Sequence, residues 1–328
     1  MSTRTHSRNM PPGASPFAVA GAALPVAKFA DPNWTAKGQP RARVPLVALE
    51  TLWFNTGTLC NLACANCYIE SSPTNDALVY LAAADVTRYL GEIAEGGLPT
   101  REIGFTGGEP FMNRGIIAML ADALERGHAV LVLTNAMKPM RRYERELLAL
   151  RAAHGDRLTL RISLDHHTRA VHEAERGPAS WTAAIDGLRW LSVHGFRIAV
   201  AGRQLAHEDN ARAGYAALFA AGDIAVDASD PASLVLFPEM DARADIAEIS
   251  TACWRILGQS PADVMCATSR MVVHRRGEPA PRVAACTLIP YHPGFDMGAT
   301  LADAARAVSL NHPHCARFCV LGGASCSA

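Results

Sequence analysis

Three cysteines in one short loop constrain this chain more than any other feature of its sequence. Cys60, Cys64 and Cys67 follow an apolar segment with the spacing C-x3-C-x2-C. Thiolates are the usual ligands of iron–sulfur clusters, and a cubane cluster has four irons, so three cysteines leave one iron open for chemistry. The alternatives are a structural zinc site or three buried thiols. Zinc takes four ligands, however, and neither a histidine nor a fourth cysteine closely follows Cys67.

The composition is that of a globular protein. The chain has 328 residues, of which 49% are hydrophobic and 19% charged, which is enough to bury a core in about two domains. Equal numbers of basic and acidic side chains, 31 of each, give a formal net charge of +0. This balance argues against nucleic acid or an anionic membrane surface as the main partner. No apolar run approaches the roughly 18 residues of a membrane span, so we predict no membrane association.

The nine cysteines fall into two groups, separated by a cysteine-free middle of the chain. Besides the three in the loop, they are Cys253, Cys266, Cys286, Cys315, Cys319 and Cys326. Two such groups are unlike the disulfide framework of a small secreted protein and indicate two metal sites in a reducing compartment. The N-terminal segment loosely resembles a secretion signal, but Pro25 interrupts its apolar part. We therefore predict a cytoplasmic protein.

Apolar strands and helices alternate between residues 46 and 237. The predicted strands are 46–55, 101–106, 128–134, 158–163, 196–201 and a sixth region at 224–227 and 234–237. The predicted helices are 83–95, 114–126, 141–153, 180–194 and 210–221. This alternation is typical of βα units and a parallel sheet. About six units predict an α/β fold with a partial (β/α)6 barrel, because a closed barrel needs eight.

Polar or cysteine residues follow five of these strands. They are the cysteine loop, Gly107–Pro110, Thr134 with Asn135, Ser163 to Asp165, and Gly202 with Arg203. The carboxyl ends of parallel strands share one edge of a sheet, where functional groups collect. The sequence therefore predicts a single site at this edge.

The character of the sequence changes after residue 240. A helix is predicted near 242–257, followed by a β-hairpin from 264 to 286 with a turn at Gly277 and a cysteine near each end. A short helix near 301–308 precedes the last cysteines. We predict three parts: an irregular N-terminal arm at 1–44, the barrel at 45–240, and a small hairpin and helix domain at 241–328 that holds a second cysteine site.

Taken together, these motifs resemble the radical S-adenosylmethionine (SAM) superfamily. Cys60-x3-Cys64-x2-Cys67 follows the first strand and Gly107-Gly108-Glu109-Pro110 follows the second, and the resemblance extends from about residue 46 to 237. It implies a partial barrel with a [4Fe-4S] cluster on the three cysteines, whose fourth iron is chelated by SAM. It also implies reductive cleavage of SAM to methionine and a 5′-deoxyadenosyl radical, which takes hydrogen from a substrate.

The resemblance also assigns roles around the cluster. Gly107, Gly108, Glu109 and Pro110 would receive the methionyl amine of SAM, with Glu109 accepting a hydrogen bond or bracing the loop. Thr134, Asn135 and Ser163 would contact the ribose and carboxylate, unless they only cap strand ends, and Arg203 would pair with the carboxylate. Asp165, in a Ser-Leu-Asp sequence, would serve SAM or substrate and is the one candidate catalytic residue.

One position departs from the family pattern. An aromatic residue normally precedes the third cysteine and packs near adenine, but here that position is Asn66, and Tyr68 follows the cysteine instead. We count Tyr68 among the cofactor-binding residues and expect adenine recognition to differ.

The C-terminal part resembles the SPASM/Twitch extensions of the same superfamily, which begin with a cysteine-flanked hairpin such as Cys266…Gly277…Cys286. Five candidate cysteines imply one auxiliary [4Fe-4S] cluster, held by Cys266, Cys286 and two of Cys315, Cys319 and Cys326. Which of these three is spare stays open, and a zinc site is the alternative. Cys253 is expected to be a thiol without a metal.

The substrate stays open between a small molecule and a peptide, with a flavodoxin- or ferredoxin-type protein as the electron donor. Residues 1–44 are too short and irregular for a peptide-recognition domain, which disfavours a peptide unless a separate partner delivers it. The alternative function is a zinc or iron–sulfur protein without SAM chemistry. His166 and His167 are expected in solvent, while His312 and His314 flank Cys315 as neighbours of the second site.

Overall fold

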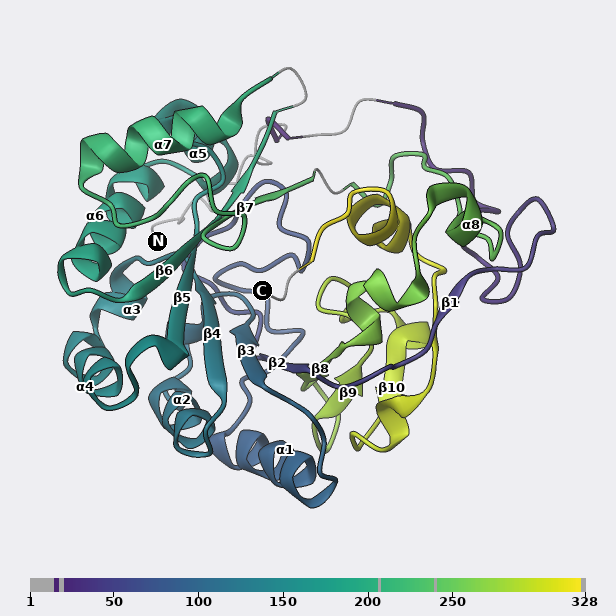
Figure 1. Cartoon of the computed structure of the whole chain (residues 1–328), viewed down its shortest axis with the longest axis horizontal. Helices are drawn as coiled ribbons and strands as arrows, with labels where there is room; N and C mark the ends of the chain where they lie inside the picture. The colour runs from purple at the N-terminus through teal and green to yellow at the C-terminus, as the bar shows by residue number, and fades with distance from the viewer. Residues whose placement is uncertain (1–14, 18–20, 206–207, 239–240, 326–328) are drawn as a thin grey trace, which may run out of the picture.

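A nine-stranded sheet runs through the computed structural model, which describes residues 15–17, 21–205, 208–238 and 241–325 (Figure 1). Its strand order is β10-β9-β8-β2-β3-β4-β5-β6-β7. The six strands of the predicted barrel are β2 (Thr51–Asn55), β3 (Glu102–Thr106), β4 (Ala129–Thr134), β5 (Leu158–Ser163), β6 (Arg197–Arg203) and β7 (Leu234–Phe237). Each pairs in parallel with the next. The predicted α/β fold with a partial barrel is confirmed.

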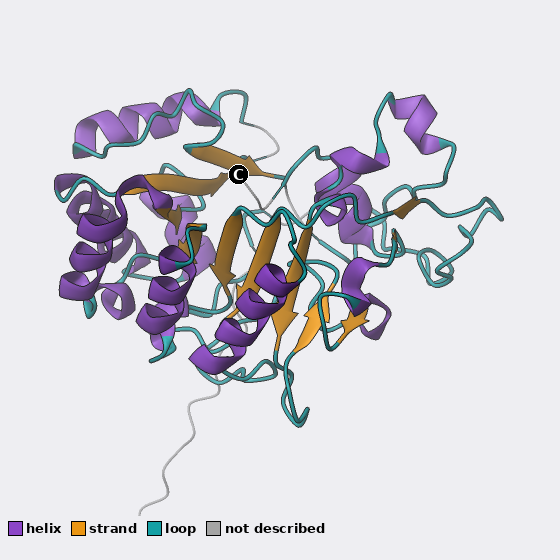
Figure 2. Cartoon of the chain, turned by 60° about the horizontal axis from the view of Figure 1, so that its bottom comes forward, coloured by secondary structure: helices purple, strands orange, loops and turns teal. Residues whose placement is uncertain are grey.

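Helices cover the outer face of the curved sheet (Figure 2). They are α1 (Ala83–Glu95), α2 (Ile116–Glu125), α3 (Lys138–Arg141), α4 (Glu144–His154), α5 (Arg169–Arg176), α6 (Ser180–Val193) and α7 (Ala211–Gly222). Helix α1 illustrates why they form: Val86, Tyr89, Leu90 and Ile93 share one face at helical spacing, and that face is buried. Single 3-10 turns lie at Pro110–Met112 and Gly155–Arg157.

Two predicted elements between residues 224 and 257 were wrong, and helix α5 was not predicted. Residues 224–227 form no strand, and the helix expected at 242–257 is reduced to α8 (Cys253–Leu257). Residues before α8 instead pair with the N-terminal arm, through bridges of Ala23 to Ala244 and Arg41 to Ser250. Tertiary pairing thus overrides a local helix pattern. Helix α5 was missed, because its sequence is mostly polar and its buried residues are His172 and Glu175.

The predicted hairpin is present as β8 (Ser269–Val273) and β9 (Arg282–Ala284), with β10 (Asp296–Gly298) beyond it. Strand β8 also pairs in parallel with β2, so the hairpin continues the barrel sheet. The helix expected at 301–308 is only a 3-10 turn at Asp303–Ala305. The division of the chain at residue 240 stays a prediction.

Short elements complete the C-terminal region. A π-helix at Cys315–Val320 carries two of the cysteines. Strand β11 (Val308–Ser309) pairs with β1 (Arg43–Val44), and 3-10 turns lie at Pro261–Asp263, Met265–Ala267 and Pro293–Phe295.

Between Leu24 and Arg41 the N-terminal arm packs on this C-terminal region. The backbone N–H of Leu24 donates to the carbonyl of Arg243 (2.7 Å), and buried Arg41 pairs with Glu248 (2.6 Å). Irregular backbone is therefore held here by pairing with a distant segment.

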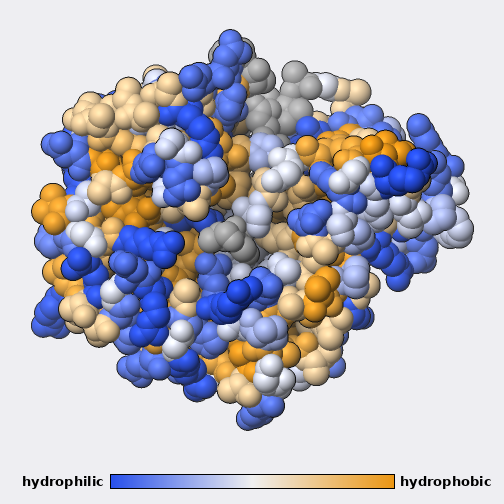
Figure 3. All heavy atoms as spheres, viewed as in Figure 1, coloured by the Kyte–Doolittle hydropathy of each residue, from blue (hydrophilic) through white to orange (hydrophobic). Residues whose placement is uncertain are grey.

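Hydrophilic and hydrophobic residues are interspersed over the face shown in Figure 3. Within the described ranges, every helix is too short or too polar to cross a bilayer.

Gly104 on β3 provides a test of how tightly the sheet packs. It lies opposite buried Trp53 on β2, and an added Cβ would come within 2.3 Å of the Trp53 ring. We expect Gly104→Ala to destabilise the protein by about 1–3 kcal/mol, because overpacking a close-packed core forces side chains apart. Gly91→Ala on α1 meets open space and should be neutral or stabilising by up to about 1 kcal/mol. Thermal unfolding of the anaerobically purified proteins, followed by circular dichroism, measures both; equal unfolding temperatures would contradict the expectation.

Candidate active site

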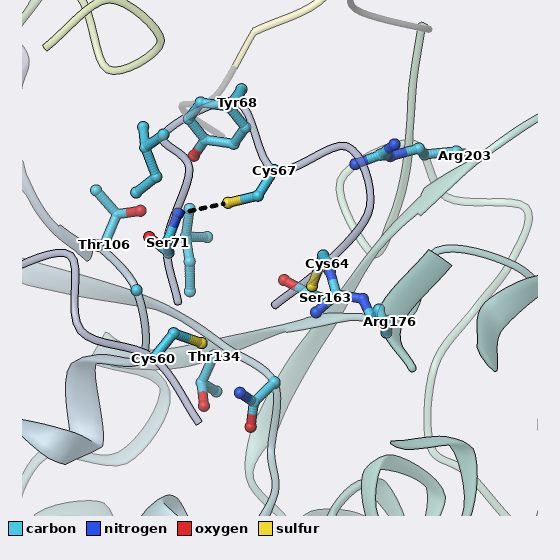
Figure 4. A pocket seen from close by; sticks show the side chains of 15 residues that line it. Cys60, Cys64, Cys67, Tyr68, Ser71, Thr106, Thr134, Ser163, Arg176 and Arg203 are labelled. Carbon is cyan, nitrogen blue, oxygen red and sulfur yellow. Dashed lines mark hydrogen bonds between the residues drawn. The ribbon is translucent and has the colours of Figure 1, made fainter. Parts of the chain in front are cut away.

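A pocket of about 110 Å³ lies at the carboxyl ends of β3 to β6, against the cysteine loop (Figure 4). Ten of the predicted site residues line it: Cys60, Cys64, Cys67, Tyr68, Gly107, Gly108, Thr134, Asn135, Ser163 and Arg203. Figure 4 shows the three cysteines around the hollow, with Cys60 near Thr134 and Cys64 beside Ser163 and Arg176. The structure thus brings together residues from segments up to 140 positions apart, on the edge where the sequence predicted them.

The cysteine loop has no regular structure and is held by Glu175, the next-to-last residue of α5. The backbone N–H of Ala65 donates to the carbonyl oxygen of Glu175 (2.7 Å), and that of Asn66 donates to its carboxylate (2.9 Å). Arg203 adds a third link, from Nη2 to the carbonyl of Asn66 (3.3 Å). Glu175 is 1% exposed, so these bonds are shielded from water.

Backbone N–H groups also approach two of the sulfurs. Leu62 donates to Sγ of Cys60 (3.4 Å), and Ser71 donates to Sγ of Cys67 (3.3 Å; Figure 4). Hydrogen bonds to cluster sulfurs are one way in which a protein sets a reduction potential. Burial raises the pKa of Cys60 to about 12 and that of Cys64 to about 11. Even with the guanidinium of Arg176 nearby, these pKa values keep both thiols protonated at neutral pH.

Two glycines form a shelf between β3 and the cysteine loop. Gly107 has a φ of +137°, and a Cβ added to Gly108 would lie 2.3 Å from the carbonyl oxygen of Leu59. The backbone N–H of Gly108 donates to the carbonyl of Gly57 (2.8 Å). Only glycine fits both the conformation of the first position and the close approach at the second.

Glu109 and Pro110, predicted to contact SAM, do not line the pocket. Glu109 is 1% exposed and lies behind the shelf, where its carboxylate accepts hydrogen bonds from Thr134 Oγ1 (2.8 Å) and from the backbone N–H groups of Asn135 (2.9 Å) and Phe111 (3.2 Å). Burial raises the pKa of Glu109 to about 7, against the effect of these bonds. Glu109 therefore links the end of β3 to the end of β4 through these hydrogen bonds.

Asp165 also lies behind the pocket wall. Burial alone would raise its pKa, but the guanidinium groups of Arg176 and Arg203 lower it to about 2. Arg176 Nε is 2.6 Å from Oδ2 of Asp165, and Arg203 Nε is 3.4 Å from Oδ1. Asp165 therefore stays a carboxylate and lines an adjoining hollow of about 90 Å³, which shares Tyr68, Ser163 and both arginines with the pocket.

Sequence reasoning missed three residues of this site. Arg176 lines the pocket beside Cys64, and Glu175 holds the loop. Both residues were missed because helix α5 was not predicted. The sequence feature that could have indicated them is the pair of opposite charges, Glu175 and Arg176, that follows the Ser-Leu-Asp sequence. Ser71 also lines the pocket, and its buried Oγ has no hydrogen-bond partner among the described residues.

The residues fit an open iron–sulfur cluster with a bound polar ligand. Three thiols on one side supply cluster ligands without a fourth, and on the other the backbone of Gly107 and Gly108 lines the pocket. The unpartnered Ser71 hydroxyl is available to such a ligand.

A second cavity contains four more cysteines. It is lined by Cys266, Cys286, Cys315 and Cys319, together with His314 and the apolar residues Val264, Met265, Leu288, Phe295, Val308 and Leu310. Burial raises the pKa of the Cys315 thiol well above its usual range and that of Cys266 to about 11. No disulfide joins any of the eight described cysteines. Four thiols in an apolar setting are a complete donor set for a closed cluster.

Two further cysteines do not line this cavity in the described structure. Cys326 lies outside the described residues, and Cys253 lies away from the cavity lining.

The histidines are less exposed than predicted. Nε2 of buried His166 is 3.3 Å from Glu208 Oε2, and Nδ1 of His167 is 3.4 Å from Oε1. His314 lines the second cavity, as expected of a neighbour of that site.

Comparison with known proteins identifies the family. Residues 54–205 match the model of the radical SAM superfamily. This part of the chain is therefore a radical SAM domain. The match implies a [4Fe-4S] cluster and SAM as the cofactors of this domain.

Individual relatives differ in how much of each chain they share. The chain is 32% identical over 168 residues to the antilisterial bacteriocin subtilosin biosynthesis protein AlbA of Bacillus subtilis (strain 168), which is 51% of this chain and 35% of AlbA. SuiB of Streptococcus suis bound to S-adenosylmethionine has a similar fold (TM-score 0.56, 13% identity), covering 77% of this chain and 64% of SuiB. Native anSMEcpe with bound AdoMet is similar over 77% of this chain and 80% of its own (TM-score 0.55, 12% identity). The chain thus spans about a third of AlbA and under two thirds of SuiB.

Glu175 provides a test of how the cysteine loop is held. We expect Glu175→Ala to weaken iron binding at Cys60, Cys64 and Cys67 by about 10–100-fold, as is typical when a group that orients metal ligands is lost. Iron release to a chelator measures this, in a Cys315→Ala/Cys319→Ala background that removes thiols of the second cavity. Glu125→Ala, at an exposed position on α2, is the control. Equal release rates for the two variants would show that Glu175 does not position the loop.

Proposed function

We propose that this enzyme cleaves SAM reductively at a [4Fe-4S] cluster held by Cys60, Cys64 and Cys67, and that the resulting radical abstracts hydrogen from a peptide. The observation that carries the proposal is one pocket lined by three thiols, a glycine shelf and strand-end polar groups. A zinc or iron–sulfur protein without SAM chemistry would account for the thiols but not for the shelf and the polar groups that face them.

When bound, the cluster supplies the electron that splits the sulfonium C–S bond of SAM into methionine and a 5′-deoxyadenosyl radical. The residues of the pocket bind and orient SAM for that step. Gly107 and Gly108 present backbone groups to the methionyl end, while Thr134, Asn135 and Ser163 offer hydroxyl and amide groups to the ribose and carboxylate. Glu109 supports them by holding Thr134 and Asn135 from behind.

Charge in the pocket comes from two arginines. Arg203 and Arg176 both line it, and the carboxylate of SAM is the negatively charged group that they would attract. Asp165 acts through them, because a carboxylate held between two guanidinium groups fixes their orientation and is a poor proton acceptor. We therefore assign Asp165 a positioning role. We assign Tyr68 to the side of the pocket that would hold the adenine of SAM.

A second [4Fe-4S] cluster on Cys266, Cys286, Cys315 and Cys319 is part of the proposal. Its support is the apolar cavity that these four side chains line, and it leaves Cys326 as the spare cysteine. Such a cluster would accept the electron left on the substrate radical, giving a net oxidation. A flavodoxin- or ferredoxin-type donor for the first cluster stays a prediction.

Peptides are the proposed substrate class because the relatives are described with peptides. AlbA is named for biosynthesis of the bacteriocin subtilosin. SuiB has been solved with its precursor peptide SuiA, and anSMEcpe with the Cp18Cys peptide. These three relatives favour a peptide over a small molecule, although the short N-terminal arm disfavours a peptide.

Anaerobic reconstitution tests the radical chemistry. We expect about eight irons per chain, and about four in Cys60→Ala/Cys64→Ala/Cys67→Ala, because each cubane cluster holds four. With dithionite and SAM, the wild type should release 5′-deoxyadenosine and the triple variant none, as measured by liquid chromatography. A wild type with full iron content and no 5′-deoxyadenosine would overturn the proposal.

The same assay tests the substrate class. A low-molecular-mass cell extract should increase 5′-deoxyadenosine release, and treating that extract with a protease beforehand should abolish the increase. An increase that survives protease treatment would exclude a peptide.

Single cysteine variants test the second cluster. We expect Cys319→Ala to lose about four irons per chain and Cys253→Ala to keep all of them, because only Cys319 belongs to the four-thiol cavity. Cys326→Ala should also keep its iron, which colorimetric iron analysis measures. Loss of iron in Cys326→Ala and not in Cys319→Ala would show that Cys326, and not Cys319, is the fourth ligand.

A further inference from the structure

A fully buried arginine lies beside the second cysteine cavity. Arg270 on β8 is 1% exposed and donates hydrogen bonds to four backbone carbonyl groups. Nε donates to Ala304 (2.9 Å), Nη1 to Cys266 (2.6 Å) and Ser269 (2.7 Å), and Nη2 to Arg306 (3.1 Å). Its guanidinium thus contacts the residue that begins the cysteine-flanked hairpin.

The charge of Arg270 lacks a carboxylate partner. Across the described residues, no Asp or Glu oxygen lies within ion-pair distance of it, whereas buried Arg41 pairs with Glu248 and Arg176 with Asp165. Burying an unpaired charge is costly. Desolvation accordingly lowers the pKa of Arg270 to about 10, while the charges of Cys266 and Cys286 act in the opposite direction.

The cysteines are therefore the nearest source of compensating negative charge. A cubane cluster held by four thiolates carries a net negative charge, which grows by one unit on reduction. A nearby fixed positive charge stabilises both oxidation states, and the reduced state more, because its charge is larger. The effect is strong at a site without water, where screening is weak.

We infer that Arg270 compensates the charge of the auxiliary cluster and raises its reduction potential. This inference rests on the proposed cluster at Cys266, Cys286, Cys315 and Cys319. It makes Arg270 a positioning and tuning residue for an electron acceptor, in addition to any role in holding the backbone around Ala304 and Arg306.

The test measures the potential of this cluster alone, in a Cys60→Ala/Cys64→Ala/Cys67→Ala background, by redox titration followed by electron paramagnetic resonance. We expect Arg270→Met to shift the ratio of reduced to oxidised cluster at least tenfold toward oxidised, a decrease of about 59 mV for a one-electron couple. Arg270→Lys, which keeps the charge, should stay near the parent. Arg306→Met is the matched control, because Arg306 is exposed and its backbone carbonyl contacts Arg270.

The possible outcomes separate the inference from the proposal beneath it. If the parent variant binds clearly fewer than about four irons per chain, the proposed auxiliary cluster itself is refuted. An intact cluster with the same potential in Arg270→Met and the parent would overturn only the role of Arg270. If Arg270→Met holds no iron, Arg270→Gln replaces it, because glutamine keeps donors without charge. Iron loss in both neutral variants but not in Arg270→Lys supports the inference, and loss in all three overturns it in favour of a purely geometric role.

Discussion

The active site depends on the two hydrogen bonds by which Glu175 holds the backbone of Ala65 and Asn66. Between Cys60 and Cys67 the chain has no helix or strand to define the positions of its thiols. Glu175 lies near the end of α5, the helix that follows β5, and it holds the loop through both its backbone carbonyl and its buried carboxylate. Ser15 of the N-terminal arm donates to the other oxygen of the same carboxylate (2.5 Å). The beginning of the described chain is thereby tied to the same anchor.

The two cysteine sites differ in how they handle charge. At the first, Arg176 and Arg203 are paired with Asp165 and Glu175, and polar side chains line the pocket. At the second, the lining is apolar, and buried Arg270 beside it has no carboxylate within reach in the described chain. A polar pocket suits a ligand that enters and leaves, whereas an apolar enclosure suits a group that stays and exchanges electrons only.

Much of this arrangement could be read from the sequence, because it depends on strong local signals. Apolar strands followed by cysteine, glycine or polar residues predicted both the sheet and the edge where the site lies. The predictions that failed concern elements whose structure depends on contacts with residues distant in the sequence. Helix α5 buries His172 and Glu175 rather than an apolar face, so no buried apolar stripe marked it, and Glu175 and Arg176 were missed with it. The segment before α8 pairs with the arm instead of forming a helix. Glu109 and Asp165 were found, but their contacts with Thr134 and the two arginines, which place them behind the wall, depend on the assembled sheet.

The parallel pairing of β8 with β2 has a consequence for distance. Cys60 follows the end of β2, whereas Cys266 precedes the start of β8, and the two strands run side by side in the same direction. Cys60 and Cys266 therefore lie toward opposite ends of neighbouring strands, about one strand length apart, roughly 17 Å for five residues. Thiols at the two ends cannot share a metal, and an electron passing between them has to cross the interior of the protein. A single ligand that touched both would have to be about as long as five extended residues.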